Sequence, residues 1–487
     1  MARVVILGAG VSGHTAALRL RRMLGRRGDH EVVVVTPNAN WNWIPSNIWV
    51  GVGQMPREKV VFPLAPVYEK TGVEFHQARA MAIRPEGDGE SDQGAVDVEY
   101  TDPGRPGETA RLRYDYLINA TGPKLNFGAT PGLGPDGHTV SVCTADHAIA
   151  AAEDLRATIE RLKAGEPQTL VIGVGHGMCT CEGAAFEYAF NVEHQLREAG
   201  VRDLAEVVYL TNERELGDFG VGGMTFEQQG FVTTSALWTA SIFRERGVNA
   251  ILGAHVQRVE EGVIHYEQLD GTTHELAFDF AMLLPPFRGQ EITAYDRAGE
   301  EITDRVFAPS GFMKVDADYT PKDYEAWRAE DWPTTYESPA YANVFAVGIA
   351  FAPPHAISRP AKSPSGTVIA PAPPRTGMPS GIMGRTVAAT IADRIKSGDS
   401  ATAHTASMAR MGAGCIASAG TGMLSGSAAG MTMYPVVPDY QRFPGSGRDL
   451  RHTKGELGLA GHWTKVLLHH LFIYKAKARA MWWLIPE

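Results

Sequence analysis

The sequence predicts an α/β protein with two Rossmann-like dinucleotide-binding domains and a C-terminal helical region. Two stretches, 3–24 and 169–190, carry this prediction, because each joins an apolar strand to a glycine-rich turn and a helix. A late apolar strand at 343–350 predicts that the first domain is completed after an insertion. The chain has 487 residues, 44% of them hydrophobic and 21% charged, which exceeds what one compact core usually holds.

The composition excludes several classes of function. A formal net charge of -10 and a sequence pI near 5.9 argue against a nucleic-acid partner, which would need a basic surface. Four cysteines are too few for a disulfide scaffold and lack the paired spacing of a zinc site, so no metal is expected. The chain enters a strand at once, without the features of a secretory signal, and we expect it to begin in the cytoplasm.

The first glycine turn is expected to cradle a pyrophosphate. Gly8, Gly10 and Gly13 have the GxGxxG spacing, and Ser12 stands among them at the start of the helix. The glycines permit a tight turn, and the helix N-terminus offers free N–H groups and the positive end of its dipole. Thr36 ends the second strand where a ribose-binding carboxylate is usual, which disfavours a plain NAD site.

Two further turns extend this nucleotide site. The third strand closes with Thr121 and Gly122, and the late strand is followed by Gly348 and Ile349 instead of glycine and aspartate. Two-dinucleotide flavoproteins of the disulfide-reductase type complete an FAD site with such turns, so FAD is the expected cofactor. The expected domains are a divided FAD-binding domain, 1–146 and 306–404, an inserted second domain, 147–305, and a C-terminal region, 405–487.

The second glycine turn is degenerate. Met178 replaces the third glycine, and the following strand ends at Thr211 without a carboxylate. A bulky side chain at that position argues against tight NAD(P)H binding, so we expect the fold to be kept and the ligand lost. Cys179 and Cys181 then lie at a helix N-terminus, where the dipole is expected to lower the pKa of a thiol.

Several longer motifs are more specific than either glycine turn. They are NWIPSNIWVGVG (42–53), ATGPKLNFG (120–128), SVCTADHA (141–148), CEGAAFEYA (181–189), NVFAVGIA (343–350), PRTG (374–377) and GCIASAG (414–420). With these motifs the chain resembles the sulfide:quinone oxidoreductase family of membrane-associated FAD proteins over most of its length. The resemblance implies oxidation of sulfide to sulfane sulfur or polysulfide and reduction of a membrane quinone.

The resemblance also implies roles for three cysteines. Cys181 carries the persulfide, Cys415 reacts with the flavin, and Cys143 assists in handling sulfur. Thiolate attack on a disulfide supplies the chemistry, because hydrosulfide is itself an anionic sulfur nucleophile. Cys179 has no counterpart in the family and is interpreted as a packing residue, with a resolving thiol as the alternative.

Two titratable residues are candidates for proton transfer. Glu187, on the helix that follows Cys181, is a candidate base, and His147 is a candidate proton relay. Each has a structural alternative: Glu187 as a solvated helix residue and His147 as a buried, hydrogen-bonded imidazole. By the motifs, Pro45, Ser46, Thr376 and Gly377 join the FAD-binding residues.

The C-terminus carries an amphipathic helix. Leu467, Leu471, Tyr474 and Met481 form an apolar stripe beside Lys475, Lys477 and Arg479, and Trp482 and Trp483 follow. No run of about 18 apolar residues exists, so we expect the helix to lie in the lipid interface, with docking on the protein's own core as the alternative. The resemblance places Phe472 and Tyr474 at the quinone. The resemblance does not decide which face of the membrane the protein occupies or whether it forms a homo-oligomer.

Residues 353–374, rich in proline and small residues, are expected to form a long loop near the flavin, either a lid or a disordered segment. Three other functions are weighed. A type II NADH dehydrogenase would need an intact second glycine turn. A flavocytochrome c sulfide dehydrogenase would need export. A flavin-binding scaffold without turnover would leave the cysteines unexplained.

Overall fold

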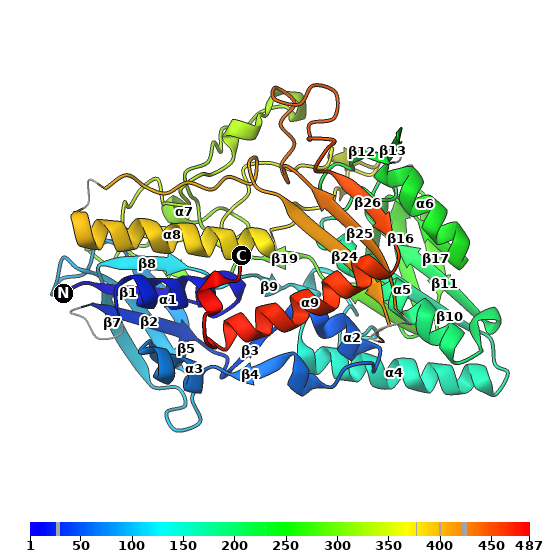
Figure 1. The fold of residues 1–487 in the computed structure, drawn as a ribbon, viewed down its shortest axis with the longest axis horizontal. Coiled ribbons are helices and arrows are strands. Elements are labelled where there is room, and N and C mark those ends of the chain that lie inside the picture. Colours follow the sequence, from blue (N-terminus) through cyan, green and yellow to red (C-terminus); the bar gives the residue numbers. More distant parts are fainter. Residues whose placement is uncertain (26–29, 229, 376, 399–400, 421, 423–425) are drawn as a thin grey trace.

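The structure is a computed structural model that describes residues 1–487 except 26–29, 229, 376, 399–400, 421 and 423–425. It confirms the expected α/β architecture (Figure 1). Its helices are α1 (Val11–Met23), α2 (Asn47–Gly51), α3 (Ala65–Thr71), α4 (Ala145–Lys163), α5 (Glu182–Glu198), α6 (Ser235–Arg246), α7 (Thr303–Val306), α8 (Met378–Ser397) and α9 (Leu459–Ala476).

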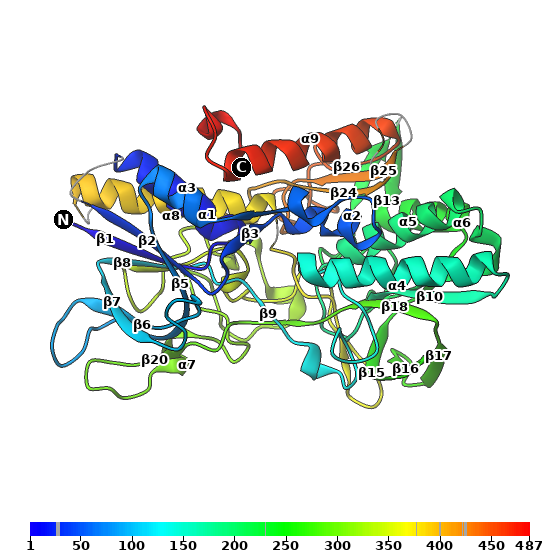
Figure 2. The same ribbon diagram turned by 90° about the horizontal axis from the view of Figure 1, so that it is seen from below.

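The first sheet joins the N-terminal strands to two late ones. Its order is β21 (Val344–Ala346), β8 (Tyr116–Asn119), β1 (Arg3–Leu7), β2 (Glu31–Thr36), β5 (Glu74–Arg84), β6 (Gly94–Tyr100) and β7 (Thr109–Tyr114), with β20 (Thr293–Ala294) beside β5. The strands from β21 to β5 are parallel, and the apolar runs of β21, β8, β1 and β2, such as VVIL in β1, are buried, as is typical of parallel strands. Figure 2 shows α1, α3 and α8 along one side of this sheet.

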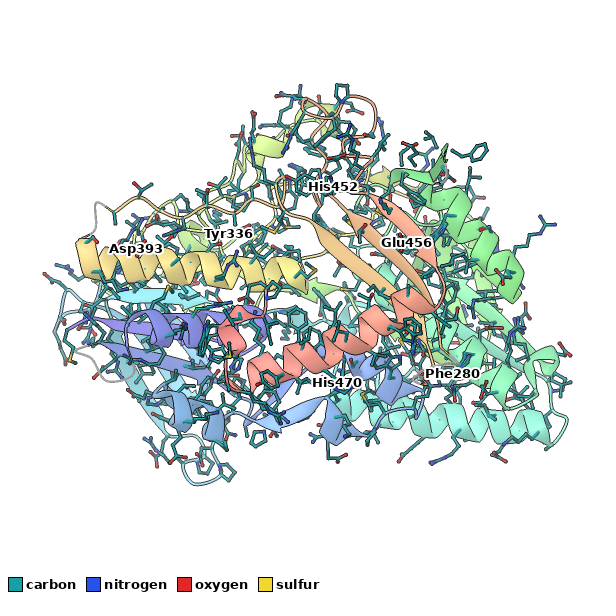
Figure 3. The ribbon with its side chains drawn as sticks, in the orientation of Figure 1. Phe280, Tyr336, Asp393, His452, Glu456 and His470 are labelled. Carbon is teal, nitrogen blue, oxygen red and sulfur yellow. The ribbon has the colours of Figure 1, made fainter. Side chains whose placement is uncertain are left out.

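A second parallel sheet forms from the inserted part of the chain. Its order is β14 (Val248–Ile251), β11 (Ala205–Leu210), β10 (Gln168–Val174) and β18 (Phe280–Leu284), and an antiparallel sheet of β15 (Ala254–Glu260), β16 (Val263–Gln268) and β17 (Thr273–Ala277) adjoins it. Phe280 marks the start of β18 in Figure 3. Because β20 already pairs with β5, the chain returns to the first sheet ahead of the expected boundary at residue 305.

The C-terminal region forms a small antiparallel sheet covered by a helix. The sheet consists of β24 (Ala413–Ala419), β25 (Ser427–Met433) and β26 (Lys454–Leu457), and α9 packs across β24 and β25 (Figure 1). Sequence analysis did not predict these strands, because a tract rich in glycine and alanine carries little strand propensity. Burial against α5 and α9 stabilises the tract as strands.

Short two-stranded pairs complete the fold. They are β3 (Asn40–Asn42) with β4 (Val61–Pro63), β9 (Lys124–Leu125) with β19 (Phe287–Arg288), β12 (Thr225–Gln228) with β13 (Phe231–Thr234), and β22 (Ala361–Lys362) with β23 (Val368–Ile369).

The segment 353–374 has defined structure, so the expectation of disorder is wrong. Its β22–β23 hairpin crosses the second glycine turn. There the N–H groups of Ala370 and Ala372 donate to the carbonyl oxygens of Gly177 and Cys179, both at 2.8 Å. These bonds hold the segment against the second glycine turn, where a dinucleotide would have to lie.

The close packing of α8 on α1 yields a stability prediction. A Cβ atom at Gly384 of α8 would lie 2.3 Å from the backbone oxygen of Ser12, although alanine normally favours a helix by about 1 kcal/mol over glycine. Because the helix backbone would have to shift to make room, we expect Gly384→Ala to lower the free energy of unfolding by about 2 kcal/mol, measured by thermal denaturation. Gly89→Ala, where no described atom lies within 4 Å, is the control, and equal stability of the two variants would contradict the packing.

Candidate functional site

The turn between β1 and α1 can accept a pyrophosphate. Gly8 has φ of +94°, and a Cβ atom there would lie 2.3 Å from the backbone oxygen of Ala120, so only glycine fits. Beside Gly10 the space is open, since no described atom would lie within 4 Å of an added Cβ atom. Within the described chain, α1 has no side-chain cap, so its first N–H groups are available to an anion.

A second helix N-terminus completes this cradle. Gly377, with φ of +66° and open space beside it, precedes α8, which is likewise uncapped by any described side chain. Gly348 has φ of +67°, and a Cβ atom there would lie 2.6 Å from Ser12 Oγ, so the turn after β21 lies against the start of α1. Two open helix ends and tight glycine turns fit the phosphates of FAD. Thr376 lies outside the described residues.

The other expected FAD-binding residues occupy varied positions. The N–H and hydroxyl groups of Thr121 donate to Asn119 Oδ1, at 3.2 and 2.8 Å. Beside Gly122 there is open space, because no described atom would lie within 4 Å of an added Cβ atom. Ile349 is half-buried after β21. Thr36 is buried at the end of β2, where its hydroxyl oxygen accepts the N–H of Asn38 at 3.5 Å.

Pro45 and Ser46 lie in a short 3-10 turn (Ile44–Ser46) that faces α9. The Ser46 hydroxyl is buried and shares a hydrogen bond of 2.9 Å with His469 Nδ1. This contact ties the turn to the C-terminal helix, a link that the motif alone did not indicate.

The structure brings the three predicted redox cysteines together. Cys181 immediately precedes α5 with φ of 72°, a left-handed conformation that is rare outside glycine. A Cβ atom on Gly183 would lie 3.0 Å from Cys415 Sγ, so the sulfur carried by β24 lies over the first turn of α5. Charges on Cys143 and Cys415 both affect the ionisation of Cys181. All three cysteines are free thiols.

Burial, not the helix dipole, dominates the ionisation of these thiols. It raises the pKa of Cys181 to about 12 and those of Cys143 and Cys415 to about 11. The expectation of a lowered thiol pKa at the helix N-terminus is therefore wrong, because desolvation and the adjacent Glu182 outweigh the dipole. A thiolate here needs a nearby cation.

Arg375 is a buried cation beside Cys181 that sequence analysis did not single out. Its guanidinium donates to the carbonyl oxygen of Phe351 and lies 4.6 Å from the ring centroid of Phe312. Its Nε atom is buried and has no partner among the described residues. The PRTG motif contains this arginine, so the signal was present but was interpreted only for its threonine and glycine.

Glu187 and Lys465 form a buried ion pair beside Cys415. Glu187 Oε2 lies 2.8 Å from Lys465 Nζ, and Oε1 accepts the N–H of Ser418 at 3.1 Å. Burial raises the pKa of Glu187, and Lys465 opposes this rise. Burial also raises the pKa of the Cys415 thiol; Glu187 adds to that rise, whereas Lys465 lowers it. Lys465 was missed because a single lysine on an amphipathic helix is usually solvated.

His147 and Cys179 take different places. The His147 ring packs edge-on against Phe127, with centroids 5.9 Å apart, and burial lowers its pKa. Its Nδ1 atom is buried without a partner in the described part of the chain. Cys179 is buried, and its thiol donates to the carbonyl oxygen of Leu284 at 3.1 Å, as a packing residue would.

The two residues expected at the quinone lie in different surroundings. The ring of Phe472 stacks on that of Trp43, with centroids 4.8 Å apart. A small cavity of about 20 Å³ lies beside this stack, between α1 and α9. Tyr474 instead donates its hydroxyl to the carbonyl oxygen of Ala480 at 2.9 Å. Of these two residues, Phe472 is therefore the one that lies at the junction of α9 with the first domain.

Known proteins share this architecture. The sulfide-quinone reductase of Aquifex aeolicus is 28% identical over 474 residues, which cover 97% of this chain and 91% of that protein. The mitochondrial sulfide:quinone oxidoreductase of Mus musculus is 24% identical, over 71% of this chain and 64% of that one.

Solved structures agree. The X-ray structure of the Aquifex aeolicus sulfide:quinone oxidoreductase superposes with a TM-score of 0.74 and 26% identity, covering 98% of this chain and 92% of that one. NDH2 of Plasmodium falciparum, at a TM-score of 0.51 and 14% identity, covers 72% of this chain and 64% of its own, and shares the fold alone. The family model for pyridine nucleotide-disulphide oxidoreductases matches residues 2–305, and the chain belongs to that family.

Proposed function

We propose that the protein is a sulfide:quinone oxidoreductase. The observation that carries this conclusion is the meeting of Cys143, Cys181 and Cys415, from three separate segments, at the N-terminus of α5. The named relatives act on sulfide and quinone. An NADH dehydrogenase is disfavoured, because the 353–374 segment hydrogen-bonds to the second glycine turn and Met178 replaces its third glycine.

FAD is the cofactor, and when bound it supplies the two-electron transfer between sulfide and quinone. The cysteines handle the sulfur. In the oxidised pair, hydrosulfide attacks the Cys181 sulfur, the bond between the two cysteines breaks, and Cys415 leaves as a thiolate. Cys181 then carries a persulfide. Arg375 and Lys465 supply the positive charge that buried sulfur anions need.

Glu187 acts at Cys415. Its charge affects that thiol, and its raised pKa suits a group that takes and returns a proton. Cys143 serves as a third sulfur site near Cys181, and His147, whose buried Nδ1 atom has no partner among the described residues, serves as a proton relay.

The protein attaches to the membrane through the apolar surface around α9. Its exposed members are Leu457, Leu459, Trp463, Leu467, Met481 and Leu484. None of the helices in the described ranges could cross a bilayer. Lys477 and Arg479 flank this surface, as an interfacial helix needs, whereas Lys475 is buried against Glu487 and does not face lipid. Quinone would approach Phe472 from this side.

The cysteine assignment predicts which thiols are essential. In anaerobic stopped flow, sulfide should bleach the FAD absorbance of the wild type, and NADH should not. In Cys181→Ala and Cys415→Ala, the rate of bleaching by sulfide should fall at least about 100-fold, because no sulfur exchange can start. Cys179→Ala, which alters only packing, is the matched control. Bleaching by NADH instead of sulfide would contradict the proposed function.

The ion pair predicts that removing the charge of Glu187 makes the Cys415 thiol more acidic and yet slows turnover. Glu187→Gln removes the anion that raises the pKa of Cys415 and leaves Lys465, so the pKa falls and more thiolate is present at pH 8. Alkylation of Cys415, followed by peptide mass spectrometry, should become about tenfold faster, whereas sulfide-driven bleaching should slow. Glu456→Gln, exposed on β26 in Figure 3, should change neither rate. Faster bleaching in Glu187→Gln would argue against its role as a base.

The apolar surface predicts membrane binding by specific residues. Leu467 is 56% exposed and Leu484 62% exposed, so each can enter lipid. Leu467→Glu and Leu484→Glu should each weaken co-sedimentation with anionic lipid vesicles about tenfold, in line with the loss of a buried leucine. Met81→Glu, on β5 at the first sheet, should bind as the wild type does. Unchanged binding of both leucine variants would exclude this surface.

A further inference from the structure

Three buried carboxyl groups lie behind Cys181 and have no place in the mechanism above. Glu182 begins α5 and Glu213 follows β11, and both are fully buried; Asp218, on the same loop as Glu213, is half-buried. We call these three residues the carboxyl cluster. Asp218 is the member of the cluster that lies nearest the protein surface, because Glu182 and Glu213 are both 0% exposed.

Glu213 and Asp218 are held in place by hydrogen bonds. Glu213 accepts the N–H of Phe219 and the hydroxyl of Thr211, both at 2.8 Å. Asp218 accepts the hydroxyl of Ser358 and the N–H of Gly220, the latter at 3.0 Å. Fixed carboxyl groups of this kind can exchange protons without rearranging the loop.

Glu182 is different, because its carboxylate oxygens make no hydrogen bond of regular geometry with the described residues, although the side chain of Asn212 lies close enough to oppose the rise of its pKa. The side chain points toward the loop of Asp218, since a Cβ atom on Gly220 would lie 3.3 Å from Glu182 Oε2. The Tyr209 hydroxyl lies 3.1 Å from the backbone carbonyl oxygen of Glu182 and 3.3 Å from Glu213 Oε2, so it joins the start of α5 to the Glu213 carboxyl group. An unpaired buried carboxylate is costly, so Glu182 is stable only with a proton or with a partner that brings one.

The charges around the cluster favour stored protons. Burial and mutual repulsion raise the pKa of Glu182 well above its usual range, and burial raises that of Glu213 to about 7. Cys179 and Cys181, from the preceding loop, also face Glu182 and would add negative charge if ionised. Arg448 is a cation that acts on Asp218 while donating to backbone carbonyl oxygens.

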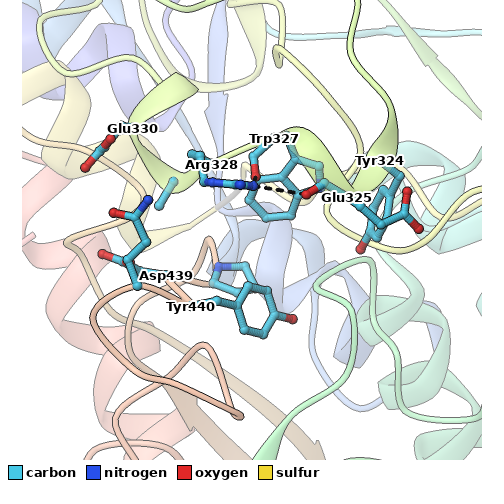
Figure 4. Close-up of a pocket in the computed structure, with 10 residues that line it drawn as sticks. Tyr324, Glu325, Trp327, Arg328, Glu330, Asp439 and Tyr440 are labelled. Carbon is cyan, nitrogen blue, oxygen red and sulfur yellow. Dashed lines mark hydrogen bonds between the residues drawn. The ribbon is translucent and has the colours of Figure 1, made fainter.

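Figure 4 shows a cavity of about 510 Å³, and the charge of Asp218, the outer member of the cluster, acts on Tyr324 in the wall of this cavity. Tyr324 and Tyr440 line this cavity, and their charges act on Arg448, as does that of Asp218. The Tyr324 hydroxyl donates to the carbonyl oxygen of Ile357 at 2.6 Å, next to Ser358. A proton that reaches Asp218 is therefore close to solvent.

We propose that the carboxyl cluster accepts the proton of the Cys181 persulfide and passes it to the cavity, with Glu182 as the positioning residue nearest the sulfur. This inference rests on the proposed function. The S–H bond of the persulfide breaks, its electron pair stays on sulfur, and the proton moves to a carboxylate of the cluster. The two electrons of sulfide oxidation leave separately, so one proton is released for each hydrosulfide oxidised.

The first test does not depend on turnover. Infrared spectroscopy of the full, FAD-loaded protein at pH 7 should show the C=O band of a protonated, buried carboxyl group. Glu182→Gln, which breaks no hydrogen bond seen in the structure, should remove intensity from this band. Glu215→Gln, at an exposed position on the same loop, should not. Absence of the band from the wild type would overturn the proposal.

The second test uses the reaction. Sulfide-driven bleaching should slow about 100-fold in Glu182→Gln and Glu213→Gln, while bleaching by dithionite stays unchanged. The ratio of wild-type to Glu213→Gln rates should rise as the pH rises through about 7, because the acceptor is then ionised only in the wild type. The ionisation of sulfide itself changes both rates by the same factor, so it does not affect this ratio. A ratio of one at every pH would overturn the relay, whereas a wild type that sulfide does not bleach would contradict the proposed function instead.

Discussion

The hydrogen bonds of Ser418 hold the sulfur site together. Its N–H donates to Glu187 at 3.1 Å, its carbonyl oxygen accepts from Asn191 at 2.8 Å and Trp49 at 3.0 Å, and its hydroxyl pairs with His462 at 2.6 Å. All of these groups are buried, so each unmade bond would cost about 1–3 kcal/mol. One residue of β24 thereby joins α2, α5 and α9, and the strand that carries Cys415 is fixed over the helix that follows Cys181.

This burial sets the electrostatics of the site. Thiols, carboxyl groups and two cations all lie in a region that water reaches poorly, and each group is therefore stable in its charged form only beside a partner. Lys465 and Arg375 are the partners of the sulfur atoms, one from α9 and one from the loop before α8. Because α9 also carries the apolar surface, the helix that we propose to bind the membrane supplies a charge to the reacting centre.

The second domain keeps the fold of a dinucleotide-binding unit while its turn serves the cysteines. Strand β10 and helix α5 have the usual arrangement, but the chain's own segment after β23 lies against the turn and donates to its carbonyl oxygens. Cys181 uses the left-handed conformation at the start of α5, a position where a glycine would be unstrained. The backbone strain there is consistent with a residue selected for its sulfur.

Local pattern determined much of this protein: the two strand, turn and helix units, the glycine spacing of the first turn, the missing third glycine at Met178, and the cysteines to consider. These features depend on residues close together in the chain, so the sequence displays them directly. The strands of the C-terminal region, the hairpin over the second glycine turn, the raised pKa values of the thiols and the buried surroundings of Lys465, Arg375 and Glu182 were decided by tertiary structure. Each depends on which distant segments share a buried environment, and burial and charge proximity are properties of the packed chain that spacing along the sequence does not encode.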